Sequence, residues 1–189
     1  MNQMRTLFVS VICASLVFGC SSENKRDSNI AAEEQNEENF DTREDEKEAK
    51  FVADAIERKY DEMKLAELAS AKSTNKMVQD AAQQLLNEQS ESLVGFQNLA
   101  RKKGITFPVE EGNESKKKVN ELSKQQDPEF DRKWCDEIVS KHEKAIREFE
   151  SMRDKTTDPE LKELIANDLI NLRAQLDELN ALENNIAKK

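Results

Sequence analysis

Histidine and cysteine, the residue types that most often bind metals or act as nucleophiles, are scarce in this chain. Its 189 residues include one histidine, His142, and three cysteines, Cys13, Cys20 and Cys135. A di-iron centre in a four-helix bundle uses a Glu from each of two helices and a Glu-x-x-His from each of the other two. Val139 stands three residues before His142, and the chain has no Glu-x-x-His. The sequence therefore argues against a di-iron site.

Three interpretations of His142 stay open, of which a surface position is one. His142 shares one helical face with Ile138 and Ala145, so it can be a buried imidazole that is hydrogen-bonded across the core. It can also be the ligand of a single metal ion whose other ligands are carboxylates from other helices. We favour the buried imidazole, and we expect neither a metal nor an organic cofactor.

Other motifs that carry chemistry do not occur in the sequence. It has no Gly-rich phosphate loop, no thiolate and imidazole spaced for nucleophilic catalysis, and no basic patch for nucleic acid. The lysine run at 116–118 lies in a predicted connection, where a solvated turn is the simplest explanation. These observations predict a protein that is not an enzyme and does not bind nucleic acid.

The N-terminus has the layout of an export signal. Arg5 precedes an apolar run at residues 7–18, which is too short to cross a membrane and is typical of a secretory signal peptide. The ending Gly19-Cys20 resembles the lipobox of bacterial lipoproteins, in which cleavage precedes the Cys and its thiol receives a lipid. We expect a lipoprotein signal peptide over residues 1–19 and lipidation of Cys20.

The expected address is the bacterial cell envelope, with the outer membrane as the anchoring surface. Ser21, which follows the lipidated cysteine, resembles the residue that permits outer-membrane sorting in well-known lipoproteins. The membrane, reached through the lipid on Cys20, and an envelope protein are the expected partners. Cys135 then has no partner for an intramolecular disulfide, and we expect it to be a buried structural thiol.

The mature chain divides into a tether and a folded domain. Residues 20–44 are rich in Ser, Asn, Gln and Glu and have few apolar residues, so they predict a disordered acidic tether. Residues 45–189 form the predicted domain. Charged residues make up 36% of the chain and aromatic residues only 5%, a composition typical of long helices.

Four long helices are predicted from apolar residues that recur every three or four positions. Three of them cover residues 45–73, 75–103 and 127–152, and the fourth begins at Asp158 and includes the leucines through Leu182. Asp127-Pro128 and Asp158-Pro159 are the expected starts of the last two, because an N-cap carboxylate followed by proline favours helix initiation.

The connection at residues 105–126 is much longer than a hairpin between neighbouring helices needs. The helix before it is roughly 40 Å long, so this connection can return along the whole length of the domain. Residues 115–123 within it predict a short helix. The expected fold is all-α: a ferritin-like four-helix bundle with a long crossover containing a short helix.

Several segments together resemble a bacterial envelope family known as domain of unknown function 4142. The matching segments are Phe51-Val52-Ala53, 65–72, 100–107, 129–132, 142–145 and 158–162. The resemblance covers nearly all of the predicted domain. It implies an exported, often lipid-anchored, ferritin-like helical bundle without an established activity.

The resemblance also implies where a metal would bind. Family members often have an acidic residue in the first helix and His in the second and fourth, besides the position of His142. The corresponding residues here are Lys64, Gln89 and Gln175, which are poor metal ligands. We therefore expect a non-enzymatic structural or interaction module. The alternative is a ferritin-like metal-binding or stress-related protein that uses His142 in the bundle core.

Overall fold

The computed structural model describes residues 28–187, and all its regular structure is helical within that range. The helices are α1 (Ser28–Asn39), α2 (Arg43–Lys72), α3 (Lys76–Lys103), α4 (Asn113–Ser123), α5 (Glu129–Lys155) and α6 (Pro159–Ile186). The predicted all-α class is confirmed. The predicted signal peptide and Cys20 lie outside the described residues.

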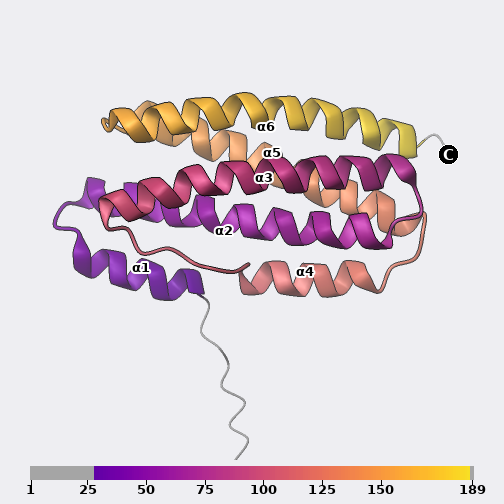
Figure 1. Ribbon diagram of the computed structural model, residues 1–189, viewed down its shortest axis with the longest axis horizontal. Helices are drawn as coiled ribbons and strands as arrows, with labels where there is room; N and C mark the ends of the chain where they lie inside the picture. The colour runs from indigo at the N-terminus through magenta and orange to yellow at the C-terminus, as the bar shows by residue number, and fades with distance from the viewer. Residues whose placement is uncertain (1–27, 188–189) are drawn as a thin grey trace, which may run out of the picture.

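The four long helices lie side by side, and the two short ones lie along one side of this group (Figure 1). α2 and α3 form one hairpin, and α5 and α6 form the other. After α3 the chain runs back along the molecule, forms α4, and only then enters α5, so that α3 and α5 point in the same direction (Figure 1). This connection packs against α2 and α5 through α4.

Local signals explain several of the helix ends. The side chain of Asp158 accepts a hydrogen bond from the N–H of Leu161 at 2.7 Å, and Pro159 begins α6, as the sequence predicted. Thr42 caps α2 by accepting from the N–H of Asp45. α3 ends at Gly104, whose φ of 70° is a conformation that glycine adopts without strain.

Asp127 does not cap α5, and that prediction was wrong. The residue before the helix is Pro128, and no side chain caps this end. The carboxylate of Asp127 accepts hydrogen bonds from the backbone N–H of Thr74, at 3.0 Å, and from its hydroxyl, at 2.6 Å. Because Thr74 lies in the turn between α2 and α3, Asp127 joins the start of α5 to that turn instead.

Residues 28–39 are helical, which differs from the disorder that the sequence predicted for this part of the 20–44 tether; residues 20–27 lie outside the described residues. The side chain of Asn36 both donates to the carbonyl oxygen and accepts from the N–H of Thr106, each at 2.8 Å. Asn29 donates to Glu57 on α2 at 2.6 Å, and Ala32 is buried. These partners are far away in sequence, so the composition of residues 28–39 did not reveal them.

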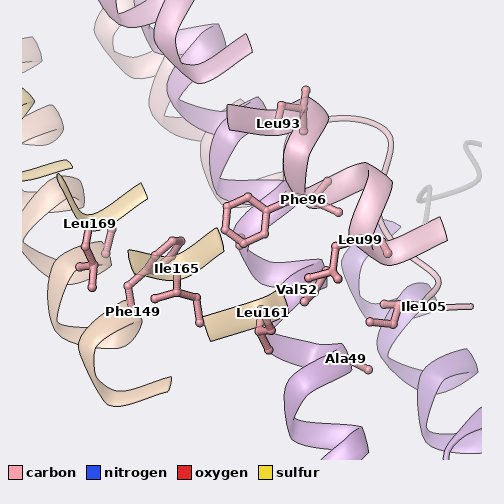
Figure 2. Packing of buried hydrophobic residues seen from close by; sticks show 14 of the residues in the cluster. Ala49, Val52, Leu93, Phe96, Leu99, Ile105, Phe149, Leu161, Ile165 and Leu169 are labelled. Carbon is pink, nitrogen blue, oxygen red and sulfur yellow. The ribbon is translucent and has the colours of Figure 1, made fainter. Parts of the chain in front are cut away.

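Two apolar clusters fill the interior, one toward each end of the long helices. In the first, Phe96 of α3, Phe149 of α5 and Ile165 of α6 meet, and Figure 2 shows their side chains directed toward one another. The second contains the side chain of Trp134, whose indole N–H donates to the carbonyl oxygen of Leu65 at 2.9 Å. Buried polar side chains lie between the two clusters.

Candidate functional site

Each long helix contributes one buried polar residue to the boundary between the two apolar clusters. These are Glu62 of α2, Gln89 of α3, His142 of α5 and Gln175 of α6, with exposed fractions between 0% and 7%. We call these four residues the polar layer. On α5, for example, His142 follows Ile138 of one cluster and precedes Phe149 of the other. The polar layer therefore lies between the two apolar clusters.

The two ring nitrogens of His142 both contact oxygen atoms. Nδ1 lies 3.0 Å from the carbonyl oxygen of Ile138, and Nε2 lies 2.8 Å from Oε1 of Gln175. These oxygens can only accept, so both nitrogens must donate a hydrogen. Both ring nitrogens therefore face acceptor oxygens, which is the hydrogen-bonding pattern of a doubly protonated ring.

The orientation of the Gln175 amide is set by two further contacts. Its Nε2 donates to a carboxylate oxygen of Glu88 at 2.6 Å, and its Oε1 accepts from Nε2 of Gln89 at 3.3 Å. Amide orientation follows from such a network. Turning the amide over would place Oε1 against the Glu88 carboxylate, so the present arrangement is the one that keeps oxygen toward His142.

The Glu62 carboxylate is fully buried, and neither of its oxygens has a hydrogen-bond donor among the described residues. Its Oε2 lies 4.0 Å from Nε2 of His142. An unpaired carboxylate in a protein interior costs several kcal/mol, which a nearby positive charge offsets. The protonated ring of His142 would supply that charge, so Glu62 and His142 are placed to form a buried ion pair.

The structure agrees in part with the positions that the family resemblance singled out. Gln89 and Gln175 do lie beside His142, but Lys64 does not belong to the polar layer. Its side chain is 42% exposed and pairs with Glu67 at 2.8 Å. Glu62 occupies the place on α2 that we had given to Lys64, and this correction restores an acidic residue to the site.

Sequence reasoning missed Glu62, although a signal was present. Ala55, Lys59, Glu62, Ala66 and Ala69 recur at steps of three and four and are all buried on one face of α2. The charged residues at 58–61 seemed to blur this pattern. In fact the helical period continues through the buried charges.

A second buried ion pair lies close to the polar layer along the helices. The ammonium of Lys59 on α2 is 2.8 Å from the carboxylate of Asp168 on α6, and both side chains are almost completely buried. The hydroxyl of Ser92 also donates to Asp168. The Lys59 ammonium is 5.9 Å from the ring centroid of Phe96 and 5.8 Å from that of Phe149. This pair was not predicted from the sequence.

The donor set of the polar layer fits a metal ion poorly. Over residues 28–187, no three side chains of His, Cys, Asp or Glu are grouped so that they could hold one. Within the layer only Glu62 and His142 are of these types. A ligating imidazole needs a free lone pair, and the hydrogen bonds of His142 use both ring nitrogens.

Cys135 is a buried free thiol, as expected from the sequence. Burial, together with the nearby carboxylate of Asp131, raises the pKa of this thiol from 9.0 to about 12. Because the thiolate is the reactive form, Cys135 is a poor nucleophile and a poor metal ligand at neutral pH.

A surface groove of about 270 Å³ between α3 and α6 reaches the polar layer from outside. Glu88 and Gln175 both line it, and the hydrogen bond between them connects the groove to His142. The remaining lining residues are Gln84, Glu91, Ser92, Asn171, Ala174 and Glu178. The groove is therefore acidic, and Gln175 lies between it and the core.

None of the helices in the described part of the chain is both long and apolar enough to cross a membrane.

The fold and the site together define a protein that is all-helical over residues 28–187 and has a polar layer in its core. The chain belongs to the DUF4142 family, a domain of unknown function, whose model matches residues 33–182. This match begins inside α1, so α1 is part of the family domain and not of a tether.

No curated protein matches the chain. Among solved structures, it is similar to the crystal structure of a DUF305 fragment from Deinococcus radiodurans, with a TM-score of 0.66 and 17% sequence identity. The similarity covers 78% of this chain and 98% of that chain. At this identity it shows the fold alone.

Proposed function

We propose that this protein is a lipid-anchored, non-enzymatic module of the bacterial cell envelope, held at the outer membrane and acting as a structural or interaction domain. The observation that carries the non-enzymatic part is the polar layer, where both ring nitrogens of His142 are engaged by acceptors. A catalytic base or a metal ligand would need one of these nitrogens free. The only histidine of the chain is therefore committed to internal hydrogen bonds.

A ferritin-like four-helix bundle is the fold that we propose for this module. The parallel direction of α3 and α5, and the connection that returns along the domain through α4, support it (Figure 1). In bundles of this kind a long crossover replaces one of the short hairpin turns. The polar layer lies in the core between the two apolar clusters, where bundles of this kind can hold metal ligands.

The anchor would hold this domain close to the bilayer. Only residues 21–27 separate Cys20 from Ser28, the first residue of α1. A fully extended chain spans at most about 3.3–3.6 Å per residue, so the eight steps from Cys20 to Ser28 bridge roughly 29 Å at most.

Replacing the lipidated cysteine tests the anchor. In a Gram-negative host, Cys20→Ser should move the protein from the membrane fraction to the soluble envelope fraction, because one lost acyl anchor removes most of the membrane affinity. Immunoblots of separated fractions would measure this. Cys13→Ser, which also removes a cysteine before the domain, should leave the protein on the membrane. Membrane association of Cys20→Ser equal to that of wild type would refute the anchor.

The alternative, a ferritin-like metal-binding or stress-related protein that uses His142, has less support. Its one favourable observation is the Glu62 carboxylate, which lacks a hydrogen-bond donor among the described residues. The ion pair with His142 accounts for that carboxylate without a metal. We therefore rank the interaction module first.

A further inference from the structure

The polar layer can hold the proton shared by His142 and Glu62 in two arrangements. His142 Nε2 and Glu62 Oε2 are 4.0 Å apart in a core without solvent contact. The present contacts place the proton on Nε2, because that nitrogen faces Oε1 of Gln175. If the Gln175 amide turned over, its NH2 group would face Nε2, and the ring would have to accept a hydrogen bond there.

We propose that Glu88, in the groove between α3 and α6, sets the charge of His142 through the amide of Gln175. Glu88 acts as a positioning residue, because it contacts neither His142 nor Glu62 but holds Nε2 of Gln175 at 2.6 Å. While that bond exists, oxygen faces His142 and the ring stays charged. This inference rests on the proposed function in one respect, namely that His142 holds no metal.

In the second arrangement, with the Gln175 amide turned over, the proton moves from His142 to Glu62 and stays within the polar layer. When Gln175 turns, the N–H bond at Nε2 of His142 breaks, and the proton forms an O–H bond with the Glu62 carboxylate. The ring and the carboxyl group are then both neutral, so no net charge enters or leaves the core. Neutralisation by proton transfer is also how buried ion pairs avoid a large desolvation cost.

Gln89 can accommodate the turned amide. In the structure as it stands, Nε2 of Gln89 donates to Oε1 of Gln175, while Oε1 of Gln89 has no hydrogen-bond donor among the described residues. If Gln89 turns together with Gln175, its oxygen accepts from the NH2 group of Gln175. The concerted turn therefore keeps the bond between the two amides.

The other charged groups next to the layer are paired with one another. Asp61 and Lys141, which adjoin Glu62 and His142 in sequence, lie 3.6 Å apart. Lys59 on α2 and Asp168 on α6 are the buried charges nearest along the helices, and they pair with each other at 2.8 Å. Glu88 is the only carboxylate of the groove with a hydrogen bond to Gln175 within residues 28–187. Cation binding to Glu88, or its protonation, would remove the acceptor for Nε2 of Gln175. The amide of Gln175 could then turn and change the protonation of His142 in the core.

Nitrogen NMR of the single histidine tests this proposal. The full mature chain would be labelled with 15N-histidine, purified in detergent without a histidine tag, and recorded at pH 7. Wild type should show protons on both ring nitrogens. Glu88→Ala should move the Nε2 signal to the range of an unprotonated nitrogen, while Glu88→Gln, which keeps an acceptor oxygen, should resemble wild type.

Glu91→Ala is the matched control, because it removes a carboxylate from the same groove without a hydrogen bond to Gln175. It should leave both nitrogens protonated. Three results would overturn the proposal: a neutral ring in wild type, no change in Glu88→Ala, or an equal change in Glu91→Ala. A wild-type spectrum that changes on adding EDTA would instead reveal a metal at His142 and refute the proposed function as well.

Discussion

Glu62 and His142 depend on each other for their burial. The carboxylate has no hydrogen-bond donor among residues 28–187, and Nε2 of the ring lies 4.0 Å from its Oε2. Removing one member of a buried ion pair leaves an uncompensated charge, which costs more than removing both. The stability of the polar layer is therefore a property of the pair.

A double-mutant cycle on this pair should show strong coupling. Glu62→Leu and His142→Leu should each destabilise the protein by about 3–5 kcal/mol, and the double variant by clearly less than their sum. Urea unfolding followed by the fluorescence of Trp134, the only tryptophan, gives each free energy. The exposed Lys64→Ala should combine additively with His142→Leu. Additivity of the Glu62 and His142 changes to within about 0.5 kcal/mol would contradict the ion pair.

Part of this site could be predicted from the sequence. The place of His142 on an apolar helical face indicated burial, and the family resemblance brought Gln89 and Gln175 to it. The choice of Lys64 over Glu62 came from the family resemblance, and hydrophobicity could not correct it because both residues are charged. Lys59 and Asp168 were missed for the same reason, since each is buried only because the other is there.

Among the helix ends, the same motif had two outcomes. Asp158-Pro159 begins α6 as predicted, whereas Asp127-Pro128 precedes α5 without a side-chain cap. The difference is Thr74, which offers the Asp127 carboxylate two donors from another part of the chain. α1 was missed in the same way, because its partner Thr106 is distant in sequence. Local signals predict the helices and some of their ends, such as the start of α6, and long-range contacts decide others, such as the start of α5.

The cap at Asp158 should contribute stability that depends on pH. Burial alone would raise the pKa of Asp158, but the N–H of Leu161 and the ammonium of Lys103 outweigh it and lower the pKa below 3.8. A lowered folded-state pKa means that the contribution is present above the unfolded value and is lost as pH falls through the folded one. Asp158→Ala should cost about 1 kcal/mol at pH 7.

Urea unfolding at pH 7 and at pH values below 3.8 would measure this difference between wild type and variant. The difference in free energy of unfolding between wild type and Asp158→Ala should become smaller as the Asp158 carboxylate is protonated. Asp158→Asn, which keeps a side-chain oxygen for Leu161, should lose less than Asp158→Ala at pH 7. An equal cost of Asp158→Ala at every pH would show that the charge contributes nothing to the cap.

For the molecule as a whole, the polar layer divides the core into two apolar clusters and joins all four long helices at one level. The all-α class could be predicted from composition and periodicity. The excess length of the connection before α5 indicated its path back along the molecule (Figure 1). Composition could not show that α1 packs onto α2, since that required the surface of the folded domain.

The central claim is that the polar layer satisfies its charges internally and does not hold a metal. Elemental analysis of the protein tests it most directly, after purification without chelators and exposure to iron, zinc, copper and manganese. We predict less than stoichiometric metal, with no difference between wild type and His142→Ala. One metal per chain that disappears in His142→Ala would contradict the claim and make this core a metal site.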